Sequence, residues 1–190
     1  MAEKIGEIKQ KLEETDISLL PAFVEQYKTD ARAGVQKLVQ TAGKRYQKLQ
    51  DEIARTEALK KYEKEYDNYT YICGIDEVGR GPLAGPVVAG AVILPKDCDI
   101  LYINDSKQLS AAKREELYDV IMEKAVATGI GMIGPERIDE INILQATYEA
   151  MRQAIGKLDP KPDLLLNDAV TIPMVDIRQV PIIEGDAKSI

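Results

Sequence analysis

The sequence predicts an α/β fold with a mixed sheet, preceded by a small all-helical N-terminal region. Two observations lead to this prediction. From residue 71 onward, short apolar segments alternate with helical patterns, whereas residues 1–70 show helical periodicity alone. The first region is also electrically neutral, so residues 71–190 carry the whole formal net charge of −7. We therefore divide the chain into a helical extension, residues 1–70, and an α/β domain, residues 71–190.

Helical spacing of apolar residues predicts the elements of the extension. It predicts a first helix over residues 5–12, a second around Phe23 and Tyr27, and a longer pattern over residues 31–66. Lys and Arg outnumber Asp and Glu between residues 28 and 64. Such a segment either lies along a phosphate backbone or forms a solvated helix with paired charges, and both interpretations stay open. A cluster of tyrosines near the boundary either stacks on nucleic-acid bases or, as we expect, packs the extension against the α/β domain: Tyr62, Tyr66, Tyr69 and Tyr71.

Five apolar segments of the α/β domain are typical of strands. They cover residues 71–75, 86–94, 127–133, 164–166 and 180–183. The first two are joined by a turn rich in Gly and Pro, so we expect them to be antiparallel. Ser110 is a good N-cap for one helix, and a second helical pattern over residues 138–155 ends before Pro160. The result is a mixed five-stranded sheet flanked by helices.

The absence of histidine excludes several classes of enzyme. The chain has 0 His, so it holds no Ser-His-Asp triad, no Cys-His dyad and no imidazole ligand. Its 2 cysteines, Cys73 and Cys98, form neither a disulfide framework nor a zinc site. We find no secretory signal and no apolar run of about 18 residues, the length that would span a membrane. We therefore expect a cytoplasmic monomer with no membrane partner.

Acidic residues follow three of the predicted strands. Asp76 and Glu77 come after the first strand, Asp168 after the fourth and Asp186 after the fifth. Ligands of α/β proteins gather at the carboxyl ends of strands, and carboxylate oxygens favour Mg²⁺ or Mn²⁺. Four such acids around one or two ions suit in-line displacement at phosphorus. For Asp76 and Glu77 the alternative is a turn that uses Asp for its hydrogen bonds.

Two neighbouring segments are candidates for substrate contact. Gly79 and Gly81 allow the backbone to approach a ligand closely, and Arg80 between them can contact a phosphate or a sugar. Asp105, Ser106 and Lys107 precede a helix, where Ser106 and Lys107 can hold another phosphate with help from the helix N-terminus. Ordinary loop and capping chemistry explains Asp105 and Ser106 equally well.

Five motifs in order carry a resemblance to a known family. They read GIDEVGRGPLAGPVVAGAVIL, NDSKQLS, IDEINILQAT, LLLNDAV and EGDAKSI. Together they cover roughly residues 71–190 and resemble bacterial type II ribonuclease H. The region 1–70 is similar to the N-terminal region of type II enzymes from low-GC Gram-positive bacteria. Arg80 favours type II, because related type III enzymes typically carry Lys at that position.

The resemblance implies a fold and an activity. It implies a ribonuclease H-like fold and a hydrolase that cleaves the RNA strand of RNA/DNA hybrids endonucleolytically, with Mg²⁺ or Mn²⁺. It also implies incision 5′ of single ribonucleotides embedded in duplex DNA, leaving 3′-hydroxyl and 5′-phosphate ends. The extension becomes a candidate module for hybrid binding or docking.

The resemblance also assigns roles to residues. The four catalytic and metal-binding acids fall on Asp76, Glu77, Asp168 and Asp186, and Gly79, Arg80 and Gly81 read the 2′-hydroxyl that distinguishes RNA from DNA. The remaining substrate-binding residues lie along the nucleic-acid backbone: Asp105, Ser106, Lys107 and Lys188.

Two features depart from the family pattern. Asn167 stands where the family usually has an apolar residue, which we expect to alter local packing without removing Asp168. Family members also continue beyond the EGDAKSI motif, so we expect a catalytic domain that is incomplete at its C-terminus. Weakened stability, exposed apolar surface and low activity would follow. The alternative function is a non-catalytic fragment that binds RNA/DNA hybrids.

Overall fold

The computed structural model describes residues 3–81 and 84–182. Contacts divide the chain into two compact units, Met1–Arg55 and Thr56–Ile190. The division falls within helix α3 (Ala33–Leu59), so residues 56–70 group with the strands that follow them. The compositional boundary at residue 70 remains a prediction from the sequence.

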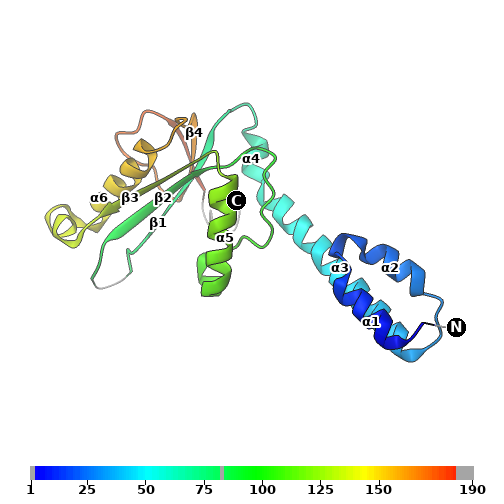
Figure 1. The fold of residues 1–190 in the computed structure, drawn as a ribbon. Coiled ribbons are helices and arrows are strands. Elements are labelled where there is room, and N and C mark those ends of the chain that lie inside the picture. The colour runs from blue at the N-terminus through cyan, green and yellow to red at the C-terminus, as the bar shows by residue number, and fades with distance from the viewer. Residues whose placement is uncertain (1–2, 82–83, 183–190) are drawn as a thin grey trace. The chain divides into compact units, whose positions relative to one another are not determined.

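Three helical segments build the N-terminal unit around one apolar core (Figure 1). They are α1 (Ile5–Glu14), α2 (Leu20–Tyr27), which follows the short 3-10 turn η1 (Ile17–Leu19), and the first part of α3. Pro21 lies in the first turn of α2, where its missing N–H breaks no helical hydrogen bond. Phe23 and Tyr27 pack with ring centroids 4.8 Å apart. The core consists of Ile8, Leu12, Leu20, Phe23, Tyr27, Val35 and Ala42.

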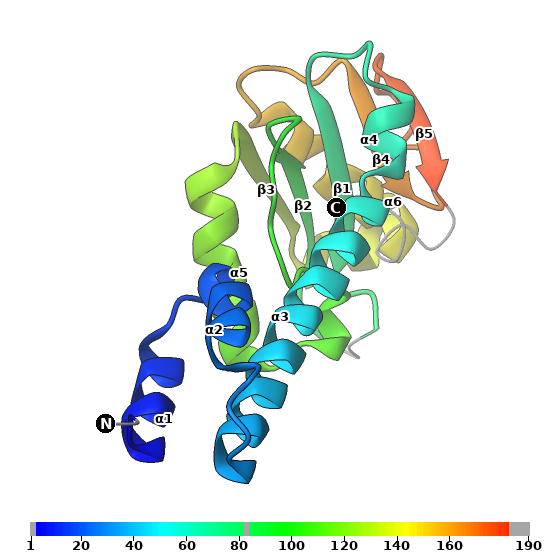
Figure 2. The ribbon, with the colours of Figure 1, turned by 90° about the vertical axis from the view of Figure 1, so that its right-hand side faces the viewer.

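The second unit contains a five-stranded mixed sheet in the order β3-β2-β1-β4-β5 (Figure 2). The strands are β1 (Ile72–Val78), β2 (Val87–Ile93), β3 (Ala127–Ile133), β4 (Leu164–Asp168) and β5 (Arg178–Ile182). The strand β1 is antiparallel to β2 and parallel to β4, while β2–β3 is antiparallel and β4–β5 is parallel. The predicted mixed sheet and the antiparallel first pair are therefore confirmed.

Helix α6 (Pro135–Gly156) covers one face of this sheet (Figures 1 and 2). Gly131 of β3 allows the close approach, since a Cβ atom there would lie 1.9 Å from the carbonyl oxygen of Ala150. The helix is interrupted at Asn142, whose φ is 67°. The Oδ1 atom of Asn142 accepts hydrogen bonds from the N–H groups of Leu144 and Gln145, at 3.0 and 3.1 Å, and so caps the second part of the helix.

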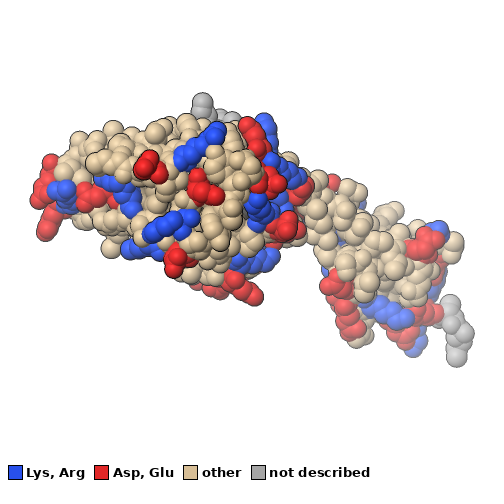
Figure 3. All heavy atoms as spheres, turned by 90° about the horizontal axis from the view of Figure 1, so that it is seen from above, with Lys and Arg blue, Asp and Glu red and all other residues tan. Residues whose placement is uncertain are grey.

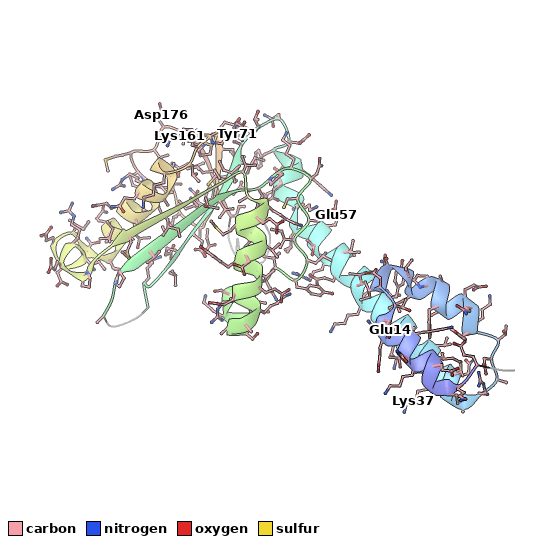
Figure 4. All side chains as sticks on the ribbon, viewed as in Figure 1. Glu14, Lys37, Glu57, Tyr71, Lys161 and Asp176 are labelled. Carbon is pink, nitrogen blue, oxygen red and sulfur yellow. The ribbon has the colours of Figure 1, made fainter. Side chains whose placement is uncertain are left out.

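Aromatic residues pack on the opposite face, beyond a break in the long predicted helix. The helical pattern over residues 31–66 forms two helices, α3 and α4 (Lys61–Glu65), with Lys60 between them. Tyr62, Tyr66 and Tyr69 pack against the cluster of Leu164, Leu166 and Ile182, as we expected of these tyrosines. Glu57, labelled in Figure 4, forms ion pairs with Lys60 and Lys64 within the same unit.

Helix α5 (Ala111–Lys124) packs on the loop between β2 and β3 through a small cluster of its own. Leu117 is buried there against Cys98 and Ile100. Acidic and basic side chains are interspersed on the surface seen in Figure 3. Within the described ranges, no helix has the length and hydropathy needed to cross a membrane.

Candidate active site

The first two candidate acids lie inside a strand. Asp76 and Glu77 belong to β1, which continues to Val78, although the sequence predicted that the strand ended at residue 75. The longer strand results from pairing with β2, since Glu77 lies opposite Ala89 and Val78 opposite Val88. An acidic dipeptide has low strand propensity, so this extension depends on the partner strand.

Asp76 and Asp168 lie side by side on neighbouring parallel strands. The last paired residues of β1 and β4 are Ile75 and Asn167, and each acid is the next residue along its strand. Side chains alternate between the faces of a sheet, so both acids project to the face opposite α6. This is the face of Leu166, whereas Asn167 is buried on the α6 side.

Asp163 fixes the register of β1 and β4 at the end of the strand pair where both strands begin. The side chain of Asp163 accepts hydrogen bonds from the N–H groups of Thr70 and Tyr71, both at 2.8 Å. The N–H of Asp163 in turn donates to the carbonyl of Tyr71 at 3.0 Å. Figure 4 labels Tyr71, at the entry to β1. If β1 slipped by one residue along β4, Asp76 would point to the other face of the sheet. The hydrogen bonds of Asp163 therefore help to keep Asp76 and Asp168 side by side.

Glu77 is held by the arginine of the glycine-flanked turn. Nη1 of Arg80 lies 3.1 Å from Oε1 of Glu77, whose side chain is only 16% exposed. The turn depends on Gly79, whose φ is +99°. A Cβ atom at this position would also lie 2.5 Å from the carbonyl oxygen of Pro86. The structure therefore requires glycine at residue 79 for two separate reasons.

The segment 104–110 forms a single 3-10 turn and then a helix start. The turn η2 (Ser106–Gln108) is capped by Asp105, whose Oδ1 accepts from the N–H of Lys107 at 2.9 Å. Ser110 caps α5 by accepting from the N–H of Lys113 at 3.2 Å, as predicted. Ser106 and Lys107 thus lie in a turn ahead of α5, and not in its first turn.

One groove of about 750 Å³ brings these segments together. Its apolar wall includes Leu94, Ile103, Ile121 and Leu166. Its polar lining contains most of the predicted site: Asp76, Glu77, Gly79, Arg80, Gly81, Asp105, Ser106, Lys107 and Asp168. The two remaining candidates, Asp186 and Lys188, lie outside the described residues. A concave site with convergent polar groups is the usual form of a substrate site.

The donor atoms of this groove suit a hard divalent cation. The acids Asp76, Glu77 and Asp168 are among its lining residues, and carboxylate oxygens are the ligands that Mg²⁺ and Mn²⁺ prefer. Within residues 3–81 and 84–182, no three acidic, His or Cys side chains gather closely enough to hold a metal ion. The chemistry of the described donors fits the ion, although the described part of the chain does not bring three of them together; the predicted four-acid set also includes Asp186.

Two residues that bond to members or neighbours of the predicted site were not predicted from the sequence. Gln179 bonds the buried side chain of Asn167 behind Asp168, and Arg114 bonds the backbone of the turn that carries Ser106 and Lys107. For Gln179, the available signal was a polar residue in the segment of β5, together with the unusual Asn167 in β4. The position of Arg114, four residues after the N-cap Ser110, gave no comparable signal.

Known proteins resemble both parts of this chain. The family model "Ribonuclease HII N-terminal domain" matches residues 4–67, and the model "Ribonuclease HII" matches residues 73–186. A ribonuclease HII from Lachnoclostridium phytofermentans is 64% identical over 98% of this chain and 74% of its own length. A ribonuclease HII from Clostridioides difficile is 49% identical over the same shares of the two chains.

Solved structures extend the likeness to the fold. The ribonuclease H2 from Pyrococcus horikoshii matches with a TM-score of 0.54 and 26% identity, over 62% of this chain and 64% of that one. The protein in the PCNA:RNase HII complex from Archaeoglobus fulgidus matches with a TM-score of 0.52 and 27% identity, over 63% and 65%. The mixed sheet is therefore a ribonuclease H-like fold. With both family models matched in order and the acids of β1 and β4 aligned in one groove, the chain belongs to the ribonuclease HII family of endoribonucleases.

Proposed function

We propose that this chain hydrolyses the RNA strand of RNA/DNA hybrids and incises duplex DNA 5′ of single embedded ribonucleotides, in a reaction that depends on Mg²⁺ or Mn²⁺. The observation that carries the proposal is the register of β1 and β4, which sets Asp76 beside Asp168 in the groove. Membership of the ribonuclease HII family supports the substrate class.

The acids have one shared role in this proposal. Asp76, Glu77, Asp168 and Asp186 would hold the divalent cation with their carboxylate oxygens. The bound cation would supply activation of the attacking water and stabilisation of charge on the leaving oxygen. Arg80 pairs with Glu77 at 3.1 Å and so favours one orientation of this acid.

The bond changes follow from the expected products. An oxygen–phosphorus bond forms between water and the scissile phosphate, and the bond from phosphorus to the 3′-oxygen breaks. The 3′-oxygen leaves with a proton as a hydroxyl, and the phosphate stays on the 5′ end of the ribonucleotide. The residues of the chain align water, phosphorus and leaving oxygen, because positioning supplies much of the catalysis in phosphoryl transfer.

Two segments recognise the substrate. The turn at Gly79, Arg80 and Gly81 approaches the sugar with its backbone and reads the 2′-hydroxyl, which is both donor and acceptor. Ser106 and Lys107, which also line the groove, hold a backbone phosphate. Lys188 adds a further phosphate contact.

The N-terminal unit contributes sequence-independent affinity for the hybrid. Lys37, Lys44 and Lys48 are exposed on α3, at spacings that place them on one side of the helix. Figure 4 labels Lys37. Within the described part of the chain these lysines form no ion pair with an acid. Replacing all three with Gln should weaken hybrid binding uniformly across sequences and reduce its salt dependence, with Lys9→Gln as a single-charge control.

Cleavage of a labelled DNA duplex with one embedded ribonucleotide, mapped to the nucleotide, tests the proposal. With Mg²⁺ or Mn²⁺ we expect a nick on the 5′ side of the ribonucleotide. The nick should be lost in Asp76→Asn and kept in Asp119→Asn, since Asp119 is exposed on α5. Metal-independent cleavage, or equal cleavage by both variants, would refute the proposal. Hybrid binding without any nick would favour the alternative of a non-catalytic binding fragment.

A further inference from the structure

Arg114 ties the turn that carries Ser106 and Lys107 to helix α5. Its Nη1 atom donates hydrogen bonds to the carbonyl oxygens of Ser106, at 3.1 Å, and of Leu109, at 2.7 Å. These carbonyls lie at the beginning of η2 and just past its end. One guanidinium nitrogen therefore bridges the two ends of the turn. Helix α5 and the segment before it are green in Figures 1 and 4.

The turn is short and its own hydrogen bonds are local: Asp105 caps it, and the N–H of Gln108 donates to the carbonyl of Asp105 at 2.9 Å. The helical part of η2 contains 3 residues, and its closing bond from the N–H of Leu109 to the carbonyl of Ser106 is long, at 3.3 Å. A single 3-10 turn is a weak structure in water, because its hydrogen bonds are few and poorly aligned. Ser106 and Lys107 are both exposed. An anchor outside the turn would therefore add to the few bonds that fix their position in the groove.

Helix α5 can act as that anchor. It has 14 residues, its N-terminus is capped by Ser110, and Leu117 fixes it by burial against Cys98 and Ile100. Arg114 lies in its second turn, within reach of η2. Arg114 does not line the groove, whereas Ser106 and Lys107 do. Its charge is thus directed at protein carbonyls and not at the space where a substrate would lie.

We infer that Arg114 is a positioning residue for nucleic-acid binding: its guanidinium holds Ser106 and Lys107 in the orientation that contacts the backbone of the hybrid. This inference rests on the proposed function, since it assigns Arg114 a role only through those two residues. The neighbouring Lys113 provides a contrast. Its Nζ atom pairs with Glu116 at 2.7 Å and lies 5.0 Å from the ring centroid of Tyr102, outside the segment 104–110.

Equilibrium binding of a fluorescently labelled RNA/DNA hybrid by the full chain, in EDTA so that nothing is cleaved, tests the inference. Arg114→Met and Lys113→Met each remove one positive charge at adjacent positions. We expect Arg114→Met to raise Kd about tenfold, the loss typical of an ordered phosphate contact, and Lys113→Met to raise it by at most about twofold. Arg114→Lys should recover most of the affinity, because an ammonium can still donate to two carbonyls. Equal losses in the two Met variants would mean that charge alone matters.

A double-mutant cycle separates positioning from direct contact. If Arg114 acts through Lys107, Arg114→Met should have little further effect when Lys107→Met is already present. Additive losses would show that Arg114 contacts the hybrid itself, and would overturn the inference. Lys113→Met combined with Lys107→Met gives the additive reference.

Hydrogen exchange of the free protein supplies a measurement that does not depend on substrate. The amides of Gln108 and Leu109 should exchange faster in Arg114→Met than in the parent, while the amide of Leu117 keeps its rate. Unchanged exchange at Gln108 and Leu109 would overturn the positioning role whatever the affinities are. A parent chain that binds no hybrid, yet shows the faster exchange in the variant, would instead refute the proposed function and leave the anchoring of the turn established.

Discussion

The side-chain amides of Asn167 and Gln179 meet on the covered face of the sheet, where Nδ2 of Asn167 lies 2.8 Å from Oε1 of Gln179. Gln179 also accepts from the N–H of Ile172 at 2.7 Å and donates to the carbonyl of Ile172 at 2.9 Å. Nδ2 of Asn167 donates a second bond, to the carbonyl of Val170 at 3.2 Å. The pair thereby joins β4, β5 and the loop that begins directly after Asp168.

Replacing Gln179 with Leu should destabilise the protein. The change removes the partner of both backbone groups of Ile172 and one of the two hydrogen bonds of the Asn167 amide, and Asn167 is only 1% exposed. A buried polar group left unsatisfied costs roughly 1–3 kcal/mol, so we expect a loss of about 2–4 kcal/mol in the free energy of unfolding. Urea denaturation of the full chain measures it.

Gln145→Leu is the matched control for this change. Gln145 is exposed on α6, so the same substitution should alter the free energy of unfolding by less than about 0.5 kcal/mol. Similar losses in the two variants would show that the bonds between Asn167, Gln179 and Ile172 contribute no net stability.

Gly131→Ala tests the contact between β3 and α6. A methyl group there would lie 1.9 Å from the carbonyl oxygen of Ala150 and 2.9 Å from the backbone nitrogen of Ala154, so the helix must move. Overpacking a core commonly costs about 1–3 kcal/mol, and backbone atoms cannot yield as a side chain can. We expect a loss at or above the upper end of this range in thermal or urea unfolding.

Gly156→Ala provides the comparison. Gly156 lies in α6, and no atom lies within 4 Å of the place that a Cβ atom would occupy there. Its stability should equal or exceed that of the parent, since Ala is a better helix former than Gly. If both substitutions proved harmless, the close approach of α6 to the sheet would be wrong.

The N-terminal unit should lose stability in acid through Asp30. Hydrogen bonds from Arg32 lower the pKa of this carboxylate from 3.8 to about 2. The guanidinium contributes most and the backbone N–H of Arg32 contributes second. A pKa that is lower in the folded state gives stability that is fully present above the unfolded value. That stability is lost as the pH falls from about 4 toward about 2.

Melting temperatures of the parent and of Asp30→Asn, followed by circular dichroism from pH 7 to pH 2, test this effect. The variant should melt lower than the parent at pH 7, and the difference should shrink as the pH approaches 2. Asp51→Asn, also on the N-terminal unit, should leave the pH dependence of the parent in place. A difference between parent and Asp30→Asn that stayed constant from pH 7 to pH 2 would contradict the assignment.

Local pattern was sufficient to predict much of the fold. Residues 127–133 form a strand with the predicted bounds, and Ser110 caps its helix through a bond to a residue three positions away. The extension of β1 past residue 75 was not predictable in the same way, because β2 provides its hydrogen bonds. The break at Lys60 and the interruption at Asn142 likewise lie inside patterns that look continuous along the chain.

The site shows the same limit. The order of acids after apolar segments singled out Asp76 and Asp168 as candidates, but only the register of β1 and β4 places the two side by side. Partners that are distant in sequence, such as Gln179 for Asn167, follow from that register and from the loop path, neither of which a single sequence encodes locally. Arg114 is close in sequence to Ser106, yet its contact depends on the angle between η2 and α5.

Cys73 should be inert toward thiol reagents in the folded protein. It is fully buried in the core beneath α6, and burial raises the pKa of its thiol to about 12. Only the thiolate reacts, so at pH 8 its reactive fraction is on the order of 10⁻⁴ even before access is considered. Burial also raises the pKa of Cys98, which is 9% exposed and lies in a loop.

Reaction with a colorimetric disulfide reagent tests this expectation. The variants Cys98→Ser and Cys73→Ser each keep one thiol, so the signal of each variant comes from that thiol alone. Cys98→Ser, which keeps Cys73, should react only after unfolding in urea. Cys73→Ser, which keeps Cys98, should react slowly in the folded state. Rapid modification of native Cys98→Ser would show that the sheet opens beneath α6, which the packing around Cys73 does not allow.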